Sequence, residues 1–527
     1  MSGNCTRTSG RPLSTQHSVL STSGYPDESM TIRDHIRFTI NGREKSVGGR
    51  AAFLTLANYL REQGATGTKV VCAEGDCGAC SVLVRHGSGD FMVVNSCIQS
   101  LLQLDGCSIV TVEGIADGDS LHPVQQSMID HYGSQCGYCT PGFVVAMAGL
   151  TEAGQPLDEQ AVKDGLTGNL CRCTGYEPIV KAALATNAAA APRLRDRYPG
   201  IEDDHRSVLI EADGRAFFAP ISLGEAIRFK RDHATATILQ GGTDVGVWVN
   251  KRDFNAPAML SLAKINELGE ISFEESRIVV GANVSLTEFE AAVRDTIPEL
   301  HGILRIFGSP QIKNAGTLVG NIANGSPIAD TLPYLFVAGA ELELAGAGGI
   351  RRVPVERFYR GYKTFDLNPD EIITRVVVPV VTTKADRVLR LYKVSRRTDL
   401  DISAFTAAIL LRVDEGRIAA AKIAYGGVAP VVMRMPKLEA FLAGKRLEPE
   451  TFEEAGAIAR GEVSPISDVR GSREYRLQLC ENILQKFYFD AFTEPVPIEI
   501  AGFRVGQAFQ PVPDGPAGKP VLHQGRP

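Results

Sequence analysis

The stretch "CAEGDCGAC", residues 72–80, places three cysteines within nine residues, interleaved with two glycines and two acidic residues. A disulfide uses two sulfurs, whereas all-cysteine zinc sites and iron–sulfur clusters use four thiolates, so these three cysteines require a fourth from elsewhere in the chain. The spacing C-x4-C-x2-C followed by a distant cysteine is typical of plant-type [2Fe-2S] sites. We therefore expect Cys72, Cys77, Cys80 and the downstream Cys97 to hold one such cluster.

The residues around this loop predict a small β-grasp-like unit. Its predicted elements are strands over residues 32–40 and 81–84 and a helix over residues 52–62. Gly75 and Gly78 let the loop backbone curl so that N–H groups face the sulfurs, and such hydrogen bonds stabilise an anionic cluster. Residues 91–95 are predicted to form the return strand of a hairpin, which turns at "GSGD" and carries Cys97 back towards the loop.

A second group of four cysteines has the spacing C-x2-C followed by C-x-C. Its members are Cys136, Cys139, Cys171 and Cys173. Thr140 as N-cap and Pro141 as the first helical residue predict a helix directly after Cys139, with the positive end of its dipole towards the cluster. Residues two apart do not share a helix face, so the C-x-C pair is expected in a turn. Further predicted helices, near residues 123–132 and 158–166 and after Pro178, complete a four-helix domain with cysteines at its turns.

Structural zinc is the alternative for both groups, because zinc sites also use four thiolates and short C-x2-C knuckles. The C-x4-C-x2-C and C-x-C spacings favour iron–sulfur clusters over zinc. Cys107 lies in an alternating strand pattern and Cys480 in a helical pattern, so both are expected to be buried core thiols. Cys5 lies in a leader rich in Ser, Thr and Gly.

Size and composition restrict the class of protein. A chain of 527 residues has room for three or more domains, and 44% hydrophobic with 22% charged residues is typical of globular proteins. The net charge of -6, without dense Lys and Arg runs, argues against a nucleic-acid partner. Residues 1–30 lack the apolar core of a secretion signal, and apolar runs such as 376–381 are too short to span a membrane. We therefore expect a cytoplasmic protein with no membrane partner, whose clustered thiols bind metal.

Three motifs in this order, "CAEGDCGAC", "SQCGYCTPGF" and "GNLCRCTGY", resemble the iron–sulfur half of the molybdenum hydroxylases, the xanthine dehydrogenase and aldehyde oxidase family. The resemblance extends from about residue 32 to residue 492. The chain ends where the molybdopterin-binding half of the single-chain members would begin, so it is most similar to the small subunit of two-subunit bacterial xanthine dehydrogenases. The resemblance implies that the molybdenum site lies in a partner chain.

The sequence departs from the family pattern at three places. Val71 stands where the family usually has glycine before the first cysteine, and Glu177 replaces an arginine near the second cluster. The segment between Cys80 and Cys97 is also shorter, which implies a tighter hairpin. None of these departures removes a ligand.

Two glycine-rich turns lie in the second half of the chain. "ILQGGTDVG", residues 238–246, follows a short apolar strand, and "GTLVGNIANGSPIAD" occupies residues 316–330. Glycines in such turns let backbone N–H groups approach a pyrophosphate. Neither turn has the G-x-G-x-x-G pattern of a Rossmann domain, and one such turn alone is a weak signal. Two of them, separated by an α/β pattern, resemble the FAD domain of the same family.

The resemblance also implies which residues contact FAD. They are Ile238, Leu239, Gln240, Gly241, Gly242, Thr243, Asp244, Val245, Phe307, Thr317, Leu318, Val319, Gly320, Asn321, Asp330, Ile373 and Lys393. Phe307 falls on the aromatic residue that stacks near the isoalloxazine, and a plain core phenylalanine is the alternative. Val319 replaces a glycine common in the family, which restricts how closely that peptide approaches the cofactor. Lys393 lies in "YKVSRRTDLDIS", residues 392–403, with Arg397 nearby.

These observations predict a multidomain α+β chain. The expected parts are a disordered leader (1–31), a β-grasp plant-type [2Fe-2S] ferredoxin domain (32–115), a four-helix [2Fe-2S] domain (116–190), a linker (191–208), a two-part α/β FAD-binding domain of the non-Rossmann, vanillyl-alcohol-oxidase-like type (209–384), a C-terminal α+β flavoprotein domain (385–494) and a disordered tail (495–527).

The resemblance implies an electron-transfer subunit with no catalytic residues of its own for substrate hydroxylation. A molybdopterin-binding large subunit would oxidise hypoxanthine and xanthine to urate, in a heterotetramer of two small and two large chains. Electrons would then pass through the helical-domain cluster, the ferredoxin-like cluster and FAD to NAD+. The alternatives are an aldehyde or N-heterocycle hydroxylase that uses oxygen or another acceptor, and a zinc-stabilised interaction protein without catalysis.

Overall fold

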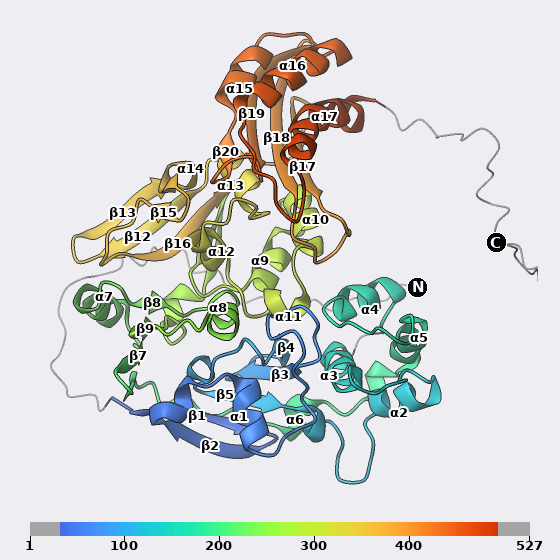
Figure 1. The fold of residues 1–527 in the computed structure, drawn as a ribbon, viewed down its shortest axis with the longest axis vertical. Coiled ribbons are helices and arrows are strands. Elements are labelled where there is room, and N and C mark those ends of the chain that lie inside the picture. The colour runs from blue at the N-terminus through green and yellow to red at the C-terminus, as the bar shows by residue number, and fades with distance from the viewer. Residues whose placement is uncertain (1–31, 153, 155, 494–527) are drawn as a thin grey trace, which may run out of the picture.

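The computed structural model describes residues 32–152, 154 and 156–493, so the predicted leader and tail lie outside the described residues. In Figure 1, the two domains that carry the paired cysteine groups lie side by side at the bottom, a module of two sheets lies above them, and a smaller sheet-and-helix domain lies at the top. The ferredoxin-like domain therefore lies below the two-sheet module, with the helical domain beside it.

The first domain is a five-stranded sheet with one helix. Its strand order is β2-β1-β5-β3-β4, with β1 parallel to β5 and the other neighbours antiparallel, which confirms the predicted β-grasp arrangement. The elements are β1 (His35–Ile40), β2 (Arg43–Gly48), α1 (Leu56–Glu62), β3 (Ser81–His86), β4 (Met92–Asn95) and β5 (Cys107–Val110). Alternate residues of β1 are buried, because a strand with one face on the core points every second side chain inward.

The predicted helix over residues 52–62 begins later than expected. Residues 49–53 form a short 3-10 helix instead. Thr55 is the N-cap of α1, because its hydroxyl accepts a hydrogen bond from the N–H of Asn58 and its backbone is extended. Hydrophobic periodicity predicted a helix start at residue 52. The Thr55 cap places the start of α1 at Leu56 instead.

The second domain contains the four predicted helices. They are α2 (Pro123–Asp130), α3 (Thr140–Thr151), α4 (Glu159–Leu166) and α5 (Glu177–Ala185). The predicted cap of α3 is wrong: Cys139 is the N-cap, and Thr140 is the first helical residue. The Thr140 hydroxyl donates a hydrogen bond to Oγ of Ser134 (2.8 Å) and makes no capping bond to α3. The helix N-terminus consequently lies at a predicted ligand.

Residues 191–208, the predicted linker, run along the first domain and contain α6 (Leu194–Arg197). The Glu152 carboxylate accepts hydrogen bonds from the first two N–H groups of this helix (2.7 and 3.2 Å). Near the end of the segment, Asp204 pairs with Arg33 at 2.8 Å. The segment is therefore anchored to both cysteine-bearing domains.

The module above these domains contains two sheets. The lower sheet has the order β6-β7-β9-β8 and comprises β6 (Val208–Ala212), β7 (Arg215–Ala219), β8 (Thr237–Ile238) and β9 (Ala258–Leu260), with α7 (Leu223–Asp232) and α8 (Val245–Arg252). Ile210 and Phe217 of this sheet share one hydrophobic core with Ile36 and Phe38 of β1. The module and the ferredoxin-like domain are therefore packed as one body.

The upper sheet of the module is antiparallel, with the order β10-β11-β16-β12-β13. Its strands are β10 (Ile271–Glu274), β11 (Arg277–Gly281), β12 (Glu341–Gly346), β13 (Gly349–Pro354) and β16 (Ile372–Pro379). The helices are α9 (Leu286–Val293), α10 (Pro298–Ile306), α11 (Pro310–Lys313), α12 (Leu318–Asn324), α13 (Leu332–Ala338) and α14 (Val355–Phe358), followed by the hairpin β14 (Tyr359–Gly361) and β15 (Thr364–Phe365).

The C-terminal domain is a four-stranded antiparallel sheet covered by helices. Its elements are β17 (Arg387–Val394), β18 (Phe405–Asp414), β19 (Arg417–Gly426), β20 (Met433–Arg434), α15 (Pro436–Leu442), α16 (Pro449–Glu462) and α17 (Arg473–Phe492). Cys480 of α17 is fully buried, which raises the pKa of its thiol to about 12, and Cys107 of β5 is fully buried as well. Both cysteines are the core thiols that the sequence predicts.

Among the helices of the described residues, none combines the length and the apolar character needed to cross a lipid bilayer.

Candidate functional site

The first cysteine group converges at one end of the ferredoxin-like sheet. Cys72, Cys77 and Cys80 lie in the loop before β3, and Cys97 follows β4, the antiparallel neighbour of β3. The Cys72 thiol is hydrogen-bonded to Cys77 and Cys97, and the Cys80 thiol to Cys97. Because Cys72 is hydrogen-bonded to both partners, the pKa of its thiol is lowered and those of Cys77 and Cys97 are raised. The hairpin thus returns Cys97 to the loop, as predicted.

Two glycines give this loop its curl. Gly75 (φ 86°) and Gly78 (φ 65°) occupy the left-handed region, which other residues rarely adopt. The backbone of Glu74 and of Cys77 is hydrogen-bonded to the Cys72 sulfur. The loop therefore presents N–H donors to its sulfurs, the arrangement that stabilises the charge of an iron–sulfur cluster.

The second cysteine group lies at the turns of the helical domain. The Cys136 thiol is hydrogen-bonded to Cys173, and the Cys139 thiol to Cys171. The Cys171 sulfur accepts hydrogen bonds from the N–H groups of Cys173 and Thr174, both at 3.4 Å. The C-x-C pair therefore lies in a turn that directs backbone donors at a sulfur, again as an anionic cluster requires.

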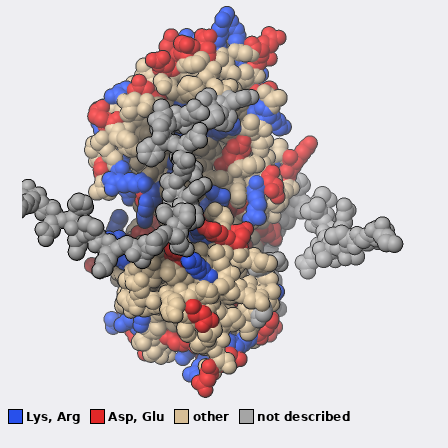
Figure 2. Space-filling model, turned by 90° about the vertical axis from the view of Figure 1, so that its right-hand side faces the viewer, with Lys and Arg blue, Asp and Glu red and all other residues tan. Residues whose placement is uncertain are grey.

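The second group is the more exposed of the two. Cys136 and Cys173 are exposed and Cys171 is buried, whereas in the first group Cys80 and Cys97 are buried and the other two cysteines are half-buried. Three exposed tyrosines lie within four residues of Cys136 or Cys173 in the sequence: Tyr132 (83% exposed), Tyr138 (51%) and Tyr176 (39%). Figure 2 views the side of the molecule on which α4 and α5 lie in Figure 1, and its lower part carries few charged side chains. We call the surface formed by Cys136, Cys173 and these three tyrosines the tyrosine face.

The pairing of the thiols fits binuclear clusters. Among the described residues, no group of three or more His, Cys, Asp and Glu side chains is arranged to hold a single metal ion. In the second group the thiols contact one another in two pairs, whereas in the first group Cys72 contacts Cys77 and Cys97, and Cys97 also contacts Cys80. A [2Fe-2S] cluster takes two thiolates on each of its two irons, which fits four neighbouring thiols.

The two cysteine loops meet through backbone contacts. The N–H of Leu170, which precedes Cys171, donates a hydrogen bond to the carbonyl of Cys77 (3.0 Å). Gly78 and Gly142 lie at this contact, because an added Cβ at Gly78 would be 2.3 Å from the carbonyl oxygen of Gly168, and one at Gly142 would be 2.3 Å from that of Gly78. Glycine beside the ligands therefore brings the two cluster sites to backbone contact.

The two glycine-rich turns also touch. The first turn joins β8 to α8, and the second leads into α12, whose N-cap Thr317 accepts a hydrogen bond from the N–H of Gly320 (2.9 Å). An added Cβ at Gly241 would be 2.4 Å from the carbonyl oxygen of Ala315, so only glycine permits this approach. Asn324 of α12 donates a hydrogen bond to Asp244 of the first turn (3.1 Å).

The turns keep backbone accessible where a phosphate group would bind. Gly320 is exposed at the first turn of α12, and its N–H is bonded to the Thr317 hydroxyl. Gly241, Gly242 and Thr243 are half-buried. This fits the pyrophosphate of FAD, which glycine-rich turns and helix N-termini bind through N–H groups.

Several predicted FAD contacts have side chains that point into the core. Leu239, Leu318, Val319 and Ile373 are 8% exposed or less, so these residues would meet a cofactor through their backbone. The valine at position 319 therefore places its side chain away from the surface of the turn. Phe307 is half-buried at the end of α10 and packs partly on the core.

Asp330 and Lys393, from different domains, form a buried ion pair at 2.7 Å. Ser403 donates a hydrogen bond to the second oxygen of Asp330 (2.6 Å) and accepts one from Lys393 (2.7 Å). Burial raises the pKa of Asp330, and Lys393 opposes that rise. This network joins the module of two sheets, called the FAD module below, to the C-terminal domain. Ser403 belongs to the network but was not among the residues predicted from the sequence.

The segment around Arg397 folds over the module. The N–H of Leu400 bonds to the carbonyl of Ile306, next to Phe307 (3.3 Å). Arg397 also exerts an electrostatic effect on Asp76 of the first cysteine loop, whose pKa is raised by desolvation. Residues 395–403 consequently lie between Phe307 and the first cluster site.

Sequence reasoning missed the residues that join the two glycine-rich turns, called the flavin turns below, to the first cysteine loop, called the first cluster loop below. Asn250 of α8 donates hydrogen bonds to the carbonyls of Cys97 (2.8 Å) and Ala73 (3.0 Å). Gln103, from the ferredoxin-like domain, donates to the carbonyl of Gln240 in the first turn. The sequence signal that could have identified Asn250 was its position as a polar residue at the end of the apolar run "VGVWVN", residues 245–250.

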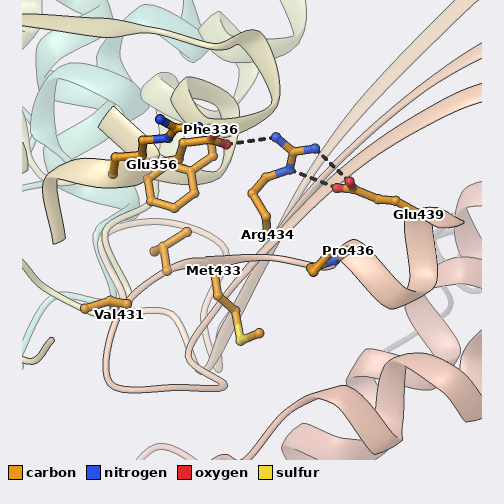
Figure 3. Close-up of a pocket in the computed structure, with 9 residues that line it drawn as sticks. Phe336, Glu356, Val431, Met433, Arg434, Pro436 and Glu439 are labelled. Atoms are coloured by element: carbon orange, nitrogen blue, oxygen red, sulfur yellow. Dashed lines mark hydrogen bonds and ion pairs between the residues drawn. The ribbon is translucent and has the colours of Figure 1, made fainter. Parts of the chain in front are cut away.

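A cavity of about 420 Å³ lies elsewhere, between the FAD module and the C-terminal domain. Figure 3 shows Arg434 reaching from β20 to Glu356 (2.9 Å) and Glu439 (2.8 Å) at its rim, beside Phe336. None of the predicted cofactor residues lines this cavity. It is a gap between the two domains.

Four family models match the chain in succession. Residues 38–102 match the "2Fe-2S iron-sulfur cluster binding domain" and residues 111–184 the "[2Fe-2S] binding domain". Residues 212–381 match the "FAD binding domain in molybdopterin dehydrogenase" and residues 390–491 the "CO dehydrogenase flavoprotein C-terminal domain". The chain therefore has two [2Fe-2S] domains and an FAD-binding domain.

The chain is similar in sequence to xanthine dehydrogenases. That of Emericella nidulans is 30% identical over 88% of this chain and 39% of its own length, and that of Oryza sativa subsp. japonica is 30% identical over 88% and 40%. The chain thus spans about two fifths of these curated relatives. Among solved structures, quinoline 2-oxidoreductase from Pseudomonas putida 86 is 29% identical, with a TM-score of 0.48 over 52% of this chain and 95% of that chain. With its two [2Fe-2S] domains, FAD-binding domain and flavoprotein C-terminal domain, the chain belongs to the molybdenum hydroxylase family.

Proposed function

We propose that this chain is the electron-transfer subunit of a xanthine dehydrogenase. It would take electrons from a molybdenum site in a molybdopterin-binding partner and deliver them to NAD+. The observation that carries the proposal is the continuous series of contacts from the tyrosine face, through the two cysteine loops, to the flavin turns.

The order of the sites supports a direction of transfer. Two helical-domain cysteines, Cys136 and Cys173, are exposed where a partner can approach, whereas none of the ferredoxin-like cysteines is fully exposed. The hydrogen bond between Leu170 and Cys77 joins the two cysteine loops. Asn250 of α8, the helix that follows the first flavin turn, bonds to Cys97 of the ferredoxin-like site. The helical-domain cluster would therefore face molybdenum, and the ferredoxin-like cluster would face FAD.

When bound, the [2Fe-2S] clusters would carry single electrons, and FAD would convert single-electron steps into hydride transfer. The residues of this chain hold and shield these groups. The eight cysteines would supply the thiolates, the loop N–H groups would stabilise the cluster charge, and the glycine turns would bind the pyrophosphate. The segment at residues 395–403 would cover the flavin beside Phe307.

The tyrosine face is the proposed docking surface for the partner. Aromatic residues are enriched at protein interfaces, and this face carries three exposed tyrosines. We propose a heterotetramer of two small and two large chains. The ten described cysteines are all free thiols, which supports a cytoplasmic location.

The substrate and the acceptor rest on the relatives named above, which are xanthine dehydrogenases. An aldehyde or another N-heterocycle as substrate, with oxygen or another acceptor, is the competing proposal. Turnover of xanthine, an aldehyde and quinoline by the complex of both chains, each with NAD+ and with oxygen, separates the two.

The first test is an anaerobic titration of the purified chain with NADH, followed by its visible spectrum. We expect about four irons per FAD and bleaching of both flavin and iron–sulfur bands. Iron and flavin without bleaching would keep the electron-transfer role and remove NAD+ as the acceptor. Zinc in place of iron would overturn the proposal.

A further inference from the structure

Gln311 lies where three domains meet. It belongs to α11, a short helix of the FAD module that lies against β4 and the first cluster loop in Figure 1. Its side chain is 1% exposed. The next residue, Ile312, packs on a buried cluster that contains Cys80 and Cys97, and an added Cβ at Gly75 would be 3.0 Å from its Cδ1. The FAD module thus reaches directly to the first cluster site.

The amide of Gln311 bonds to both iron–sulfur domains. Its Nε2 donates to Oδ1 of Asn169 in the helical domain (2.8 Å) and to Oγ of Ser81 in the ferredoxin-like domain (3.2 Å). Asn169 and Ser81 in turn both donate to the carbonyl of Gly78, at 3.0 and 2.7 Å. One amide from the FAD module therefore closes a ring of hydrogen bonds around Gly78, the residue between Cys77 and Cys80.

The contact leaves no room for adjustment. An added Cβ at Gly168 would be 1.9 Å from Oε1 of Gln311, so the amide lies directly on that backbone. The Oε1 atom is buried and has no hydrogen-bond partner among the described residues. A buried polar atom without a partner is unfavourable, so an apolar side chain would serve better if filling space were the only role of this position.

The base of Gln311 is also fixed. Lys313, two residues on, is buried and pairs with Glu290 of α9 at 2.6 Å. The Ser309 hydroxyl caps α11 by accepting a hydrogen bond from the N–H of Ile312 (3.2 Å). The Nε2 donor of Gln311 is therefore anchored to the FAD module and is independent of both iron–sulfur domains.

We propose that Gln311 is the positioning residue that fixes the spacing between the two [2Fe-2S] clusters. Asn169 lies two residues before the ligand Cys171, and Ser81 directly follows the ligand Cys80. By holding both at once, Gln311 keeps the hydrogen bond between Leu170 and Cys77 closed. The inference rests on the two cluster sites and is independent of which substrate or acceptor the protein uses.

The test measures the spacing directly. Two reduced [2Fe-2S] clusters split each other's EPR signals by a magnetic dipolar coupling that falls with the inverse cube of their distance. We would reduce the full chain with dithionite and record the coupling in the wild type, in Gln311→Met and in Gln311→Glu. Both substitutions remove the donor, and we expect a smaller splitting than in the wild type, with both clusters still present.

Gln103→Met is the matched control, because Gln103 also spans the FAD module and the ferredoxin-like domain but has its hydrogen bond to Gln240, away from Asn169. We expect it to keep the wild-type splitting. An unchanged splitting in both Gln311 variants would overturn the proposal. A variant that assembles fewer than two clusters would also contradict it, since Gln311 would then be needed for assembly and not for spacing. Failed NADH reduction would leave this result unaffected.

Discussion

At the scale of single residues, the iron–sulfur region depends on glycines as much as on cysteines. Gly78 lies between two ligands, Gly142 follows Cys139 and Gly168 precedes Cys171. Each lacks a side chain at a point where a Cβ would meet an atom of another segment at 2.3 Å or less. The cysteine spacing predicts which thiols bind iron, and these glycines explain how the two loops come together.

Gly142→Ala tests this close approach. Alanine is favoured over glycine in a helix by about 1 kcal/mol, so propensity alone predicts a more stable α3. The added methyl would instead press on the Gly78 carbonyl, and we expect a net loss of about 1–3 kcal/mol together with lower iron content. Calorimetric unfolding and iron analysis measure both effects.

Gly302→Ala is the control for that substitution, because Gly302 lies in α10 with no atom within 4 Å of an added Cβ. We expect it to stabilise the chain by up to about 1 kcal/mol. If Gly142→Ala behaved in the same way, the loop contact would not be tight.

Lys393→Met tests the buried ion pair. Removing the ammonium leaves the Asp330 carboxylate buried without its partner, and such changes cost about 3–5 kcal/mol. We expect loss of FAD and a lower unfolding temperature, and adding Asp330→Asn should largely restore the unfolding temperature. Lys486→Met removes an exposed pair with Asp490 and should cost less than about 1 kcal/mol. Equal effects of the two lysine substitutions would contradict the assignment.

At the scale of elements, side-chain caps mark the start of some helices. The Thr55 hydroxyl caps α1, whereas α3 begins after Cys139 without a side-chain cap. Helix α2 uses a histidine: Nδ1 of His122 accepts a hydrogen bond from the N–H of Val124 (3.3 Å), and Gln125 completes a capping box. Only the neutral imidazole can accept this bond.

The His122 cap predicts a pH dependence of the helical domain. Desolvation lowers the pKa of His122 below its unfolded value of about 6.5. Its contribution is therefore present above that value and is lost as the pH falls through the lower, folded-state pKa. We expect faster hydrogen exchange in α2 as the pH drops below about 6.5, after correction for the intrinsic exchange rate, by an amount equivalent to about 1 kcal/mol for the lost cap.

His122→Asn separates capping from titration, because asparagine is a good N-cap that does not titrate. The corrected exchange of α2 should become independent of pH over this range. A pH dependence that persisted in this variant would assign the effect to another group.

At the scale of the whole molecule, the chain is organised around contacts between domains. The α11 segment reaches both iron–sulfur domains and then leads into the second flavin turn. Asn250, at the other flavin turn, bonds to the first cluster loop. Both flavin turns are thus tied to the ferredoxin-like cluster site, whereas the helical-domain site has two exposed cysteines, Cys136 and Cys173.

This arrangement predicts an obligatory order of electron transfer. Cys136→Ser and Cys173→Ser should remove the helical-domain cluster and leave reduction of the ferredoxin-like cluster by photoreduced flavin intact. Cys72→Ser, which removes the ferredoxin-like cluster, should leave the helical-domain cluster oxidised under the same illumination. EPR distinguishes the two clusters. Reduction of the helical-domain cluster at the wild-type rate in Cys72→Ser would contradict a linear route.

The sequence by itself determined the kinds of domain and their ligand-bearing loops. Cysteine spacing reflects the local geometry of a loop that wraps a cluster. The spacings C-x4-C-x2-C and C-x2-C with C-x-C therefore predict [2Fe-2S] sites without a structure. The β-grasp unit and the four helices followed from local periodicity, because each element buries one face against its own domain. The resemblance added the flavin module.

Only the tertiary structure decided how these parts are joined. Gln311 and Asn169 are 142 residues apart, and Asn250 and Cys97 are 153 apart, so neither contact leaves a local pattern in the chain. The burial of Val319 and the pairing of Asp330 with Lys393 likewise depend on which face of an element meets its neighbour. Local sequence sets the geometry of a loop, whereas the distance between two loops is set by side chains that meet only after the domains have packed.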